Sequence, residues 1–305
     1  MSVAQRTTDA YRQSCEEIAD GVFVYLSGHG GPNASFIVGR EGVVLIDTLM
    51  TPRMSLALRQ AIRRITRKPV RLVIYTHHHG DHVLGCERFT PPGVVIAHEN
   101  TRLRLEELGQ EYIALFQTWR RTLQDARDVG RVKRLIYPDI TFKDALTLYH
   151  EDLRLELKFA GPAHTSNDLV VHIPQREVLI LGDLVAYRMV PGMRDSRTPS
   201  WIARLDELYT WAPRLLVPGH GTWTEEREII TENRAFLQEM WVASKAGYEA
   251  GRSWEDVYTA LDLPRRWGHL HGLNRAHEVI RRMYEELAGV PDYDTSAFRK
   301  PAALA

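Results

Sequence analysis

Residues 76–82 of this chain read Thr-His-His-His-Gly-Asp-His, a run of side chains that could bind transition metals. The candidate ligands in it are His77, His79, Asp81 and His82. The first two are separated by one residue, and in an extended backbone this spacing places both imidazoles on the same side. The last two are adjacent, so they must point in different directions and suit a second metal centre. The alternative interpretation is a polar loop that follows a strand.

Three later residues could complete such a site. They are His164 within Gly-Pro-Ala-His-Thr, Asp183 within Gly-Asp, and His220 within Pro-Gly-His-Gly. Each stands at the end of an apolar stretch or in the loop after it, where sheets commonly present functional groups. Taken alone, each could equally be a turn or capping residue. Together with residues 76–82 they form a set of imidazoles and carboxylates without thiolates, which suits Zn²⁺ and also iron or manganese.

These four motifs, in this order, resemble those of the metallo-β-lactamase-fold hydrolase superfamily. The resemblance covers residues 21–221. It implies an αββα sandwich, an α/β (α+β) fold, with the metals at one edge. It also implies two metal sites that share one carboxylate. The ligands would be His77, His79 and His164 for the first metal, Asp81, His82 and His220 for the second, and Asp183 as the bridge between them.

The resemblance further implies a reaction. A binuclear metal-dependent hydrolase would use a metal-bridging hydroxide to attack the carbonyl of a small ester, lactone, thioester or amide. Asp81 is the candidate catalytic residue, because its carboxylate could orient the hydroxide or take up a proton. We expect two divalent metal ions, with zinc preferred over iron or manganese, and predict no residues for another cofactor.

Asp183 narrows the choice within the superfamily. β-Lactamases of this fold generally have a cysteine or no ligand at the bridging position, so the aspartate favours the binuclear branch of glyoxalase II and the N-acyl-homoserine-lactone lactonases. The alternatives are a nucleic-acid phosphodiesterase, an iron-dependent persulfide dioxygenase or a broad-specificity β-lactamase-like activity. Persulfide dioxygenases lack a complete second site, whereas His82 and His220 are present here. A binding or regulatory protein on an inactive scaffold is a further alternative.

The order of the apolar patterns indicates which elements position these residues. Strands are predicted at residues 21–27, 34–39, 42–47, 70–76, 93–97, 140–148, 153–159, 169–173, 178–181 and 215–217. Helices are predicted at residues 51–67, 99–129 (a charge-rich stretch of two helices), 200–211, 225–250, 253–261 and 274–287. We therefore predict a catalytic domain over residues 1–223, with a helical insertion at 99–137, and a C-terminal helical extension over residues 224–305.

The composition limits the partners and the compartment. Lys+Arg and Asp+Glu both number 39 among the 305 residues, so the formal net charge is zero and no broad field attracts nucleic acid or an anionic membrane. Two cysteines cannot make a disulfide framework, and residues 1–20 lack the apolar core of a signal peptide. We expect a cytoplasmic protein that acts on a small molecule without binding nucleic acid or membrane. A homodimer is an alternative use of residues 99–129.

Several other side chains could support or line the site. Asp47 is expected to support the metal-binding loop, His78 to face solvent or to support the ligands, and Cys86 to be a small buried residue. Contacts with the substrate are left open for Tyr187, His29, His269 and His271, with packing as the favoured alternative.

Overall fold

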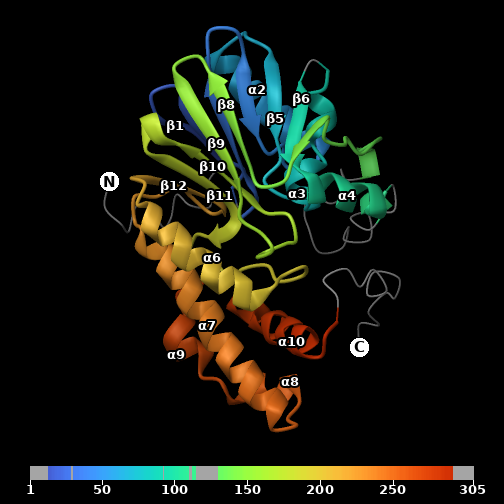
Figure 1. Ribbon diagram of the computed structural model, residues 1–305, viewed down its shortest axis with the longest axis vertical. Coiled ribbons are helices and arrows are strands. Elements are labelled where there is room, and N and C mark those ends of the chain that lie inside the picture. Colours follow the sequence, from blue (N-terminus) through green and yellow to red (C-terminus); the bar gives the residue numbers. More distant parts are fainter. Residues whose placement is uncertain (1–12, 29, 92, 110–111, 115–129, 291–305) are drawn as a thin grey trace.

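The computed structural model describes residues 13–28, 30–91, 93–109, 112–114 and 130–290. Two β-sheets lie face to face at the centre of this part of the chain, and helices cover the outer face of each sheet (Figure 1). The predicted αββα sandwich is confirmed.

The first sheet has seven strands in the described part of the chain, and they lie side by side in sequence order. They are β1 (Ser14–Ala19), β2 (Val22–Leu26), β3 (Asn33–Val38), β4 (Val43–Ile46), β5 (Val70–Ile74), β6 (Val94–His98) and β7 (Ile140–Phe142). Strands β1 to β4 are antiparallel neighbours, including the predicted hairpin of β3 and β4, whereas β4 to β7 are parallel. The sequence pattern does not predict β1, because this edge strand is mostly polar and only partly buried.

The second sheet has five strands in the order β12-β11-β10-β9-β8. They are β8 (Ala145–His150), β9 (Leu153–Phe159), β10 (Leu169–Ile173), β11 (Val178–Ala186) and β12 (Leu215–His220). The prediction of one strand over residues 140–148 is wrong, because β7 and β8 belong to different sheets. The chain crosses between the sheets at Lys143 and Asp144, where the Asp144 carbonyl accepts a hydrogen bond from the amide of Phe159 in the second sheet.

Side chains that alternate along each strand contribute to two different apolar layers. In β2, Val22, Val24 and Leu26 face the second sheet and join the apolar layer between the sheets. The intervening Phe23 and Tyr25 face outward and join the cluster under the helices of the first sheet. Successive side chains of a strand point to opposite faces, so a strand buried on both faces reads as a continuous apolar run.

Helix α2 (Pro52–Ile65) packs on the outer face of the first sheet through Leu58 and Ile62. It begins where predicted, because the hydroxyl of Thr51 accepts a hydrogen bond from the amide of Met54 at 3.2 Å and so caps the first turn. Helix α4 (Glu99–Leu108) also covers this sheet and ends before Gly109. Within the predicted helical stretch 99–129, residues 112–114 are also helical, whereas residues 110–111 and 115–129 lie outside the described residues.

The C-terminal helices share a hydrophobic cluster with the second sheet. They are α7 (Glu228–Glu249), α8 (Trp254–Ala260), α9 (Leu263–Trp267), the 3₁₀ helix η5 (Leu273–Arg275) and α10 (Ala276–Leu287), and they extend below the sandwich in Figure 1. Phe236 of α7 and Val279 of α10 lie in one cluster with Leu179 of β11 and with Trp201 of α6 (Thr198–Trp211). The division of the chain at residue 223 stays a prediction.

The cysteines and the hydropathy of the helices can also be compared with the sequence. Both cysteines are free, and burial raises the pKa of the Cys86 thiol to about 12, as expected for a small packed residue that does not react. None of the helices in the described ranges carries an apolar stretch of the length that crossing a membrane requires.

Candidate metal centre

Strand β5 leads directly into residues 76–82, and the backbone changes direction in the middle of this stretch. The chain is still extended at His79, with φ −60° and ψ 142°, and the short helix α3 (Gly80–Val83) begins at the next residue. His77 and His79 are therefore presented from extended backbone, whereas Asp81 and His82 are presented from a helical turn. The predicted separation of the two pairs follows from this change of direction.

A first cluster is formed by His77, His79, His164 and Asp183, whose ligand atoms lie within 4.8 Å of one another. His164 Nε2 lies 3.0 Å from His79 Nδ1 and 3.5 Å from Asp183 Oδ2. His77 Nε2 lies 3.9 Å from the same oxygen of Asp183. Two nitrogens bound to one tetrahedral zinc at about 2.0–2.1 Å are roughly 3.4 Å apart, so these separations suit ligands of a common ion.

A second cluster is formed by Asp81, His82 and His220. His220 Nε2 lies 3.3 Å from Asp81 Oδ2 and 3.4 Å from Asp183 Oδ2. His82 Nε2 lies 3.1 Å from Asp183 Oδ1. Asp183 thus stands between the two clusters, with one oxygen facing His82 and the other facing His164 and His220.

Asp183 and His220 lie inside strands and not beyond their ends, so the predicted strand limits at residues 181 and 217 are wrong. Strand β11 continues past Asp183 to Ala186, and β12 ends at His220. The pairing of β11 and β12 is irregular at Gly182, where the register shifts. Gly219 allows the close approach, because a Cβ at this position would collide with the Asp183 carboxylate.

Each histidine of the two clusters has its other ring nitrogen fixed by a partner. The pairs are His77 Nδ1 with Thr76 Oγ1 (3.0 Å), His79 Nε2 with Asp195 Oδ2 (2.6 Å), His82 Nδ1 with Asp47 Oδ2 (2.8 Å), His164 Nδ1 with the Gly192 carbonyl (3.0 Å) and His220 Nδ1 with the Gly30 carbonyl (2.8 Å). Such partners set the tautomer and the ring orientation, and they are typical of metal-binding histidines.

Three atoms that face neighbouring ligands within the clusters lack hydrogen-bond partners. Among the described residues, His77 Nε2, His82 Nε2 and Asp183 Oδ1 are buried and make no hydrogen bond, although the last two lie 3.1 Å apart. Buried polar atoms are rarely left unsatisfied unless an ion or a water completes them. The donor set of imidazoles and carboxylates matches zinc, so the residues present fit a metal.

The charges of the two clusters differ. Burial, and next the neighbouring His82, hold the pKa of His77 well below its ordinary value. Burial lowers the pKa of His164 to about 3 in spite of Asp183. At His220, burial also lowers the pKa, but the carboxylates of Asp183 and Asp81 outweigh it and raise the pKa to about 10. His77 and His164 of the first cluster are therefore neutral, whereas the second cluster holds protons next to its carboxylates.

The carboxylates show the reverse shift. Burial raises the pKa of Asp183, but the positive charges of His220 and His82 outweigh it and hold the pKa well below the ordinary value. Asp81 is held low in the same way, chiefly by His82 after burial. Both carboxylates are ionised at neutral pH, as ligands of a cation must be.

Asp47 supports the metal-binding stretch, as predicted. It follows β4 and is 3% exposed, and its Oδ1 accepts a hydrogen bond from the amide of Thr76 at 2.8 Å. Its Oδ2 accepts a second bond from the Thr76 hydroxyl at 2.7 Å and lies 2.8 Å from His82 Nδ1. One carboxylate therefore fixes the start of residues 76–82 and a ring of the second cluster together.

His78 is buried, so the expectation that it faces solvent is wrong. The alternative expectation, that it supports the ligands, fits its contacts. It is 2% exposed, its ring centroid lies 4.8 Å from that of His79, and its Nε2 lies 3.6 Å from Asp195 Oδ2. Its amide donates to Asn167 Oδ1 at 3.0 Å, and its ring Nδ1 lies 3.0 Å from Asn167 Nδ2. The sequence does not indicate Asn167, because its amide side chain follows His164 without a distinctive spacing.

Among the residues left open as substrate contacts, Tyr187 lies beside the second cluster, because its amide donates to the His220 carbonyl at 3.1 Å. Tyr187 is buried in the hydrophobic cluster under the second sheet. His269 is exposed and pairs with Glu232 at 2.8 Å, and the backbone of His271 bridges to Met189. His29 lies outside the described residues. Tyr187 is packed, whereas His269 and His271 are exposed, and substrate contacts of these residues stay open.

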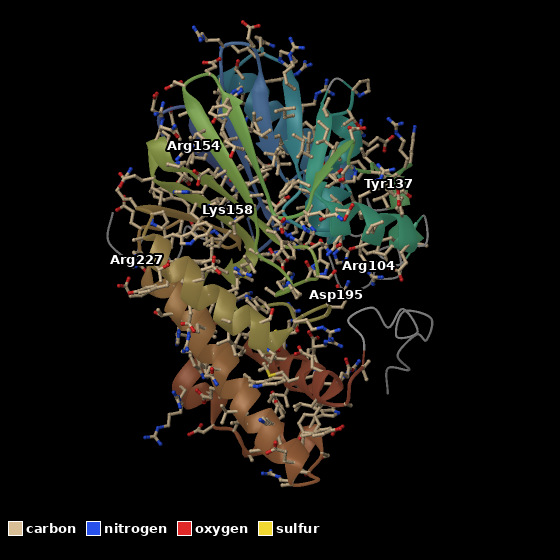
Figure 2. The ribbon with its side chains drawn as sticks, in the orientation of Figure 1. Arg104, Tyr137, Arg154, Lys158, Asp195 and Arg227 are labelled. Carbon is tan, nitrogen blue, oxygen red and sulfur yellow. The ribbon has the colours of Figure 1, made fainter. Side chains whose placement is uncertain are left out.

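Asp195 is a functional candidate that the sequence pattern did not single out. It lies in the loop between β11 and α6, is 5% exposed, and contacts His79 at 2.6 Å and His78 at 3.6 Å. Figure 2 shows it between the lower ends of the strands and the helices beneath them. A single carboxylate in a loop carries no spacing signal, so only the fold brings it to the histidines.

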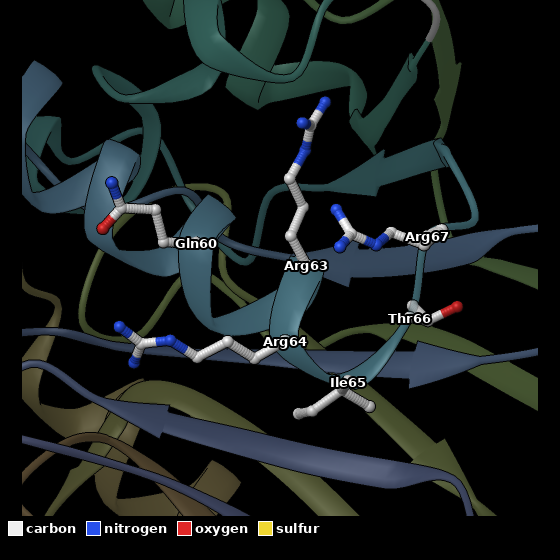
Figure 3. Close-up of a pocket in the computed structure, with 6 residues that line it drawn as sticks. All are labelled: Gln60, Arg63, Arg64, Ile65, Thr66 and Arg67. Carbon is white, nitrogen blue, oxygen red and sulfur yellow. The ribbon is translucent and has the colours of Figure 1, made fainter.

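A basic depression at the far end of α2 is separate from these clusters (Figure 3). Gln60, Arg63, Arg64 and Arg67 line it together with Ile65 and Thr66. Helix α2 begins beside the Asp47 loop and has 14 residues, so its last turn lies about 20 Å from that loop. Arginines in the last turn of a helix also interact favourably with its dipole, which explains them without a ligand.

A family model described as the metallo-beta-lactamase superfamily matches residues 27–240. The chain is 28% identical over 269 residues to the 2,4-dinitroanisole O-demethylase subunit alpha of Nocardioides sp. (strain JS1661), a match that covers 85% of this chain and 70% of that protein. It is 24% identical over 221 residues to a linear primary-alkylsulfatase of Pseudomonas sp. (strain ATCC 19151), covering 63% of this chain and 42% of the alkylsulfatase. This second match therefore spans less than half of that relative.

Solved structures with the same fold include a metallo-beta-lactamase from Pontibacter korlensis, with a TM-score of 0.61 and 23% identity over 74% of this chain and 99% of that one. The sec-alkylsulfatase Pisa1 from Pseudomonas sp. has a TM-score of 0.72 and 18% identity over 95% of this chain and 52% of that one. At these identities the likeness shows the fold alone. Because the second match covers 95% of the chain, it includes C-terminal helices.

Replacement of Asp47 by Asn should weaken zinc binding about 10- to 100-fold, because His82 loses its carboxylate partner while the shape of the side chain is kept. Asn also tolerates the positive φ of 60° at this position. A chelator-competition titration measures the affinity. The matched control is Asp139→Asn, which alters a carboxylate that accepts from the Val95 amide at 2.8 Å, away from the clusters. Equal zinc affinity in both variants would contradict the expectation.

Proposed function

The chain belongs to the metallo-beta-lactamase superfamily, and we propose that it is a binuclear metal-dependent hydrolase of a small ester-like substrate. The observation that carries the proposal is the convergence of His77 Nε2, His82 Nε2 and Asp183 Oδ1, which are buried without hydrogen-bond partners. A dead scaffold has no need to keep such atoms unsatisfied, because each one costs free energy in the interior.

Two ions would be held by separate sets that share Asp183. His77, His79 and His164 would hold the first ion, and Asp81, His82 and His220 the second. Bound divalent ions would supply Lewis acidity, which lowers the pKa of water towards neutrality and stabilises the negative charge that develops on an attacked carbonyl or comparable centre.

Asp81 would orient the attacking water. Its side chain is 27% exposed, more than Asp183 at 12%, so it is the carboxylate of the clusters that solvent reaches most easily. Its Oδ2 lies 3.3 Å from His220 Nε2 and is held ionised. A carboxylate with such a low pKa is a weak base, which favours an orienting hydrogen bond over uptake of a proton.

The exposure of the ligands indicates from which side a substrate would approach. The side chains of His77 and His82 are 1% and 0% exposed, whereas that of His220 is 19% exposed. Asp81 and His220 are therefore the groups that a substrate would meet first. The buried first cluster would lie behind them.

The relatives widen the range of candidate substrates beyond carbonyl compounds. One is named as an alkylsulfatase and another as an O-demethylase subunit for 2,4-dinitroanisole. Sulfate esters and an aryl methyl ether therefore join the esters, lactones, thioesters, amides and β-lactams to be tested. All of these can be cleaved by attack of an activated water, so the residues of the site need not change between them.

We expect zinc-loaded protein to hydrolyse at least one member of a panel of aryl esters, lactones, thioesters, β-lactams, alkyl sulfates and 2,4-dinitroanisole. Chelation of the metal should abolish the activity, and so should His77→Ala, which removes a ligand of the first cluster. The control His172→Ala removes a histidine of β10 that pairs with Glu156 at 3.2 Å and lies in neither cluster. Activity that survives both chelation and His77→Ala would refute a metal-dependent hydrolase.

Zinc binding should release more protons at the second cluster than at the first. His220, with a pKa of about 10, holds a proton at pH 7 that a metal must displace, whereas His164, with a pKa of about 3, is already neutral. At high pH fewer protons compete with the metal ion. The affinity of the second cluster for zinc should therefore rise with pH, by about tenfold per unit for each displaced proton. Calorimetric titration in buffers of different ionisation enthalpy counts the protons, and equal release at both steps would contradict the expectation.

A further inference from the structure

The loop between β11 and α6 contacts two of the three histidines of the first cluster, His79 and His164. We define the 192–198 segment as residues 192–198 of this loop. The Gly192 carbonyl lies 3.0 Å from His164 Nδ1, and Asp195 Oδ2 lies 2.6 Å from His79 Nε2. The amide of Arg197 also donates to the Ala163 carbonyl, next to His164, at 2.8 Å. The 192–198 segment therefore packs against the first cluster and fixes two of its rings.

Helix α10 holds the 192–198 segment from the other side. The Glu286 carboxylate accepts hydrogen bonds from the Ser196 hydroxyl at 2.9 Å and from the Thr198 amide and hydroxyl at 2.8 Å each. Arg282, one turn earlier, donates from Nη2 to the Ser196 carbonyl at 3.3 Å. Both side chains are buried, with exposures of 5% for Glu286 and 6% for Arg282.

This contact also replaces the usual cap of a helix. In the described structure Arg197, the N-cap residue of α6, makes no capping hydrogen bond with its own side chain. Glu286 provides the acceptor for the first turn of α6 from a distant helix. A surface Ser or Asp at the cap would stabilise α6 by about 1 kcal/mol without burying a carboxylate. The buried carboxylate therefore does more than a local cap requires.

We propose that Glu286 is a positioning residue for the first metal cluster. From α10 it holds the 192–198 segment so that Asp195 and the Gly192 carbonyl keep the rings of His79 and His164 in the orientation that binds metal. The inference rests on the proposed function, because these rings act as ligands only if the cluster binds metal. It gives the C-terminal helices a role in the metal site, although α10 lies beyond the residues 27–240 that match the family model.

The test compares the stepwise zinc affinities of Glu286→Gln and the wild-type chain. A glutamine has the same shape, but its NH₂ group would face the amide of Thr198 or the hydroxyls that donate to Glu286. In Glu286→Gln, one of the two stepwise zinc affinities should fall about tenfold or more, and the other should stay within about twofold.

Asp195→Asn should weaken the same zinc-binding step. The double variant should lose little more affinity than either single variant, because both residues act through one segment. The matched control is Glu278→Gln, an exposed glutamate of α10 that pairs with Arg275.

A lower melting temperature with unchanged zinc affinities would show that Glu286 is only a helix cap and would overturn the inference. Ser196→Ala removes a single donor to Glu286, and it provides the same comparison if the glutamine variant does not fold. It should weaken the same zinc step by a smaller factor, and unchanged affinity in this variant would overturn the inference as well. A wild-type protein that binds no zinc would refute the proposed function and the inference together, whereas an unchanged variant of a zinc-binding protein would refute the inference alone.

Discussion

A carboxylate buried among imidazoles sets the charge that these rings can carry. The oxygens of Asp183 lie 3.1 to 3.9 Å from ring nitrogens of His77, His82, His164 and His220. Burial of an uncompensated charge costs several kcal/mol, so positive charge must stand beside it. Protons on the second cluster meet this requirement in the protein alone, and divalent ions would meet it in the loaded protein. The remainder of the site follows from the need to bring the imidazoles to this carboxylate.

The fold supplies the imidazoles from both sheets. Strand β5 of the first sheet leads into residues 76–82, and β11 and β12 of the second sheet carry Asp183 and His220. Each ring is fixed on its outer nitrogen by a hydroxyl, a carboxylate or a backbone carbonyl, so that the inner nitrogen faces the other ligands. This arrangement pays the conformational entropy of the ligands during folding and not during metal binding. The metal centre to which β5, β11 and β12 bring these residues is therefore preorganised.

Residues 76–82 could be predicted as ligands because four ligand types stand there at short spacing. The full set of seven and the sandwich followed from the resemblance of the four motifs to the superfamily. His77 and His79 needed only an extended backbone to share one side. The crossing at Lys143 and the length of β11 could not be read, because apolar residues resume after Lys143-Asp144 and after Gly182-Asp183 and only the pairing partner decides where a strand ends. Asp195 and Glu286 left no signal, because each acts through contacts between segments far apart in the sequence.

The C-terminal helices also contribute to the site, because they share a hydrophobic cluster with the second sheet and contact the 192–198 segment.

We infer above all that two metal positions share Asp183. Anomalous diffraction from crystals of the zinc-loaded protein tests it most directly. We expect about two zinc peaks, one among His77, His79 and His164 and one among Asp81, His82 and His220, with Asp183 between them. A single peak, or an ion bound without Asp183, would contradict the account.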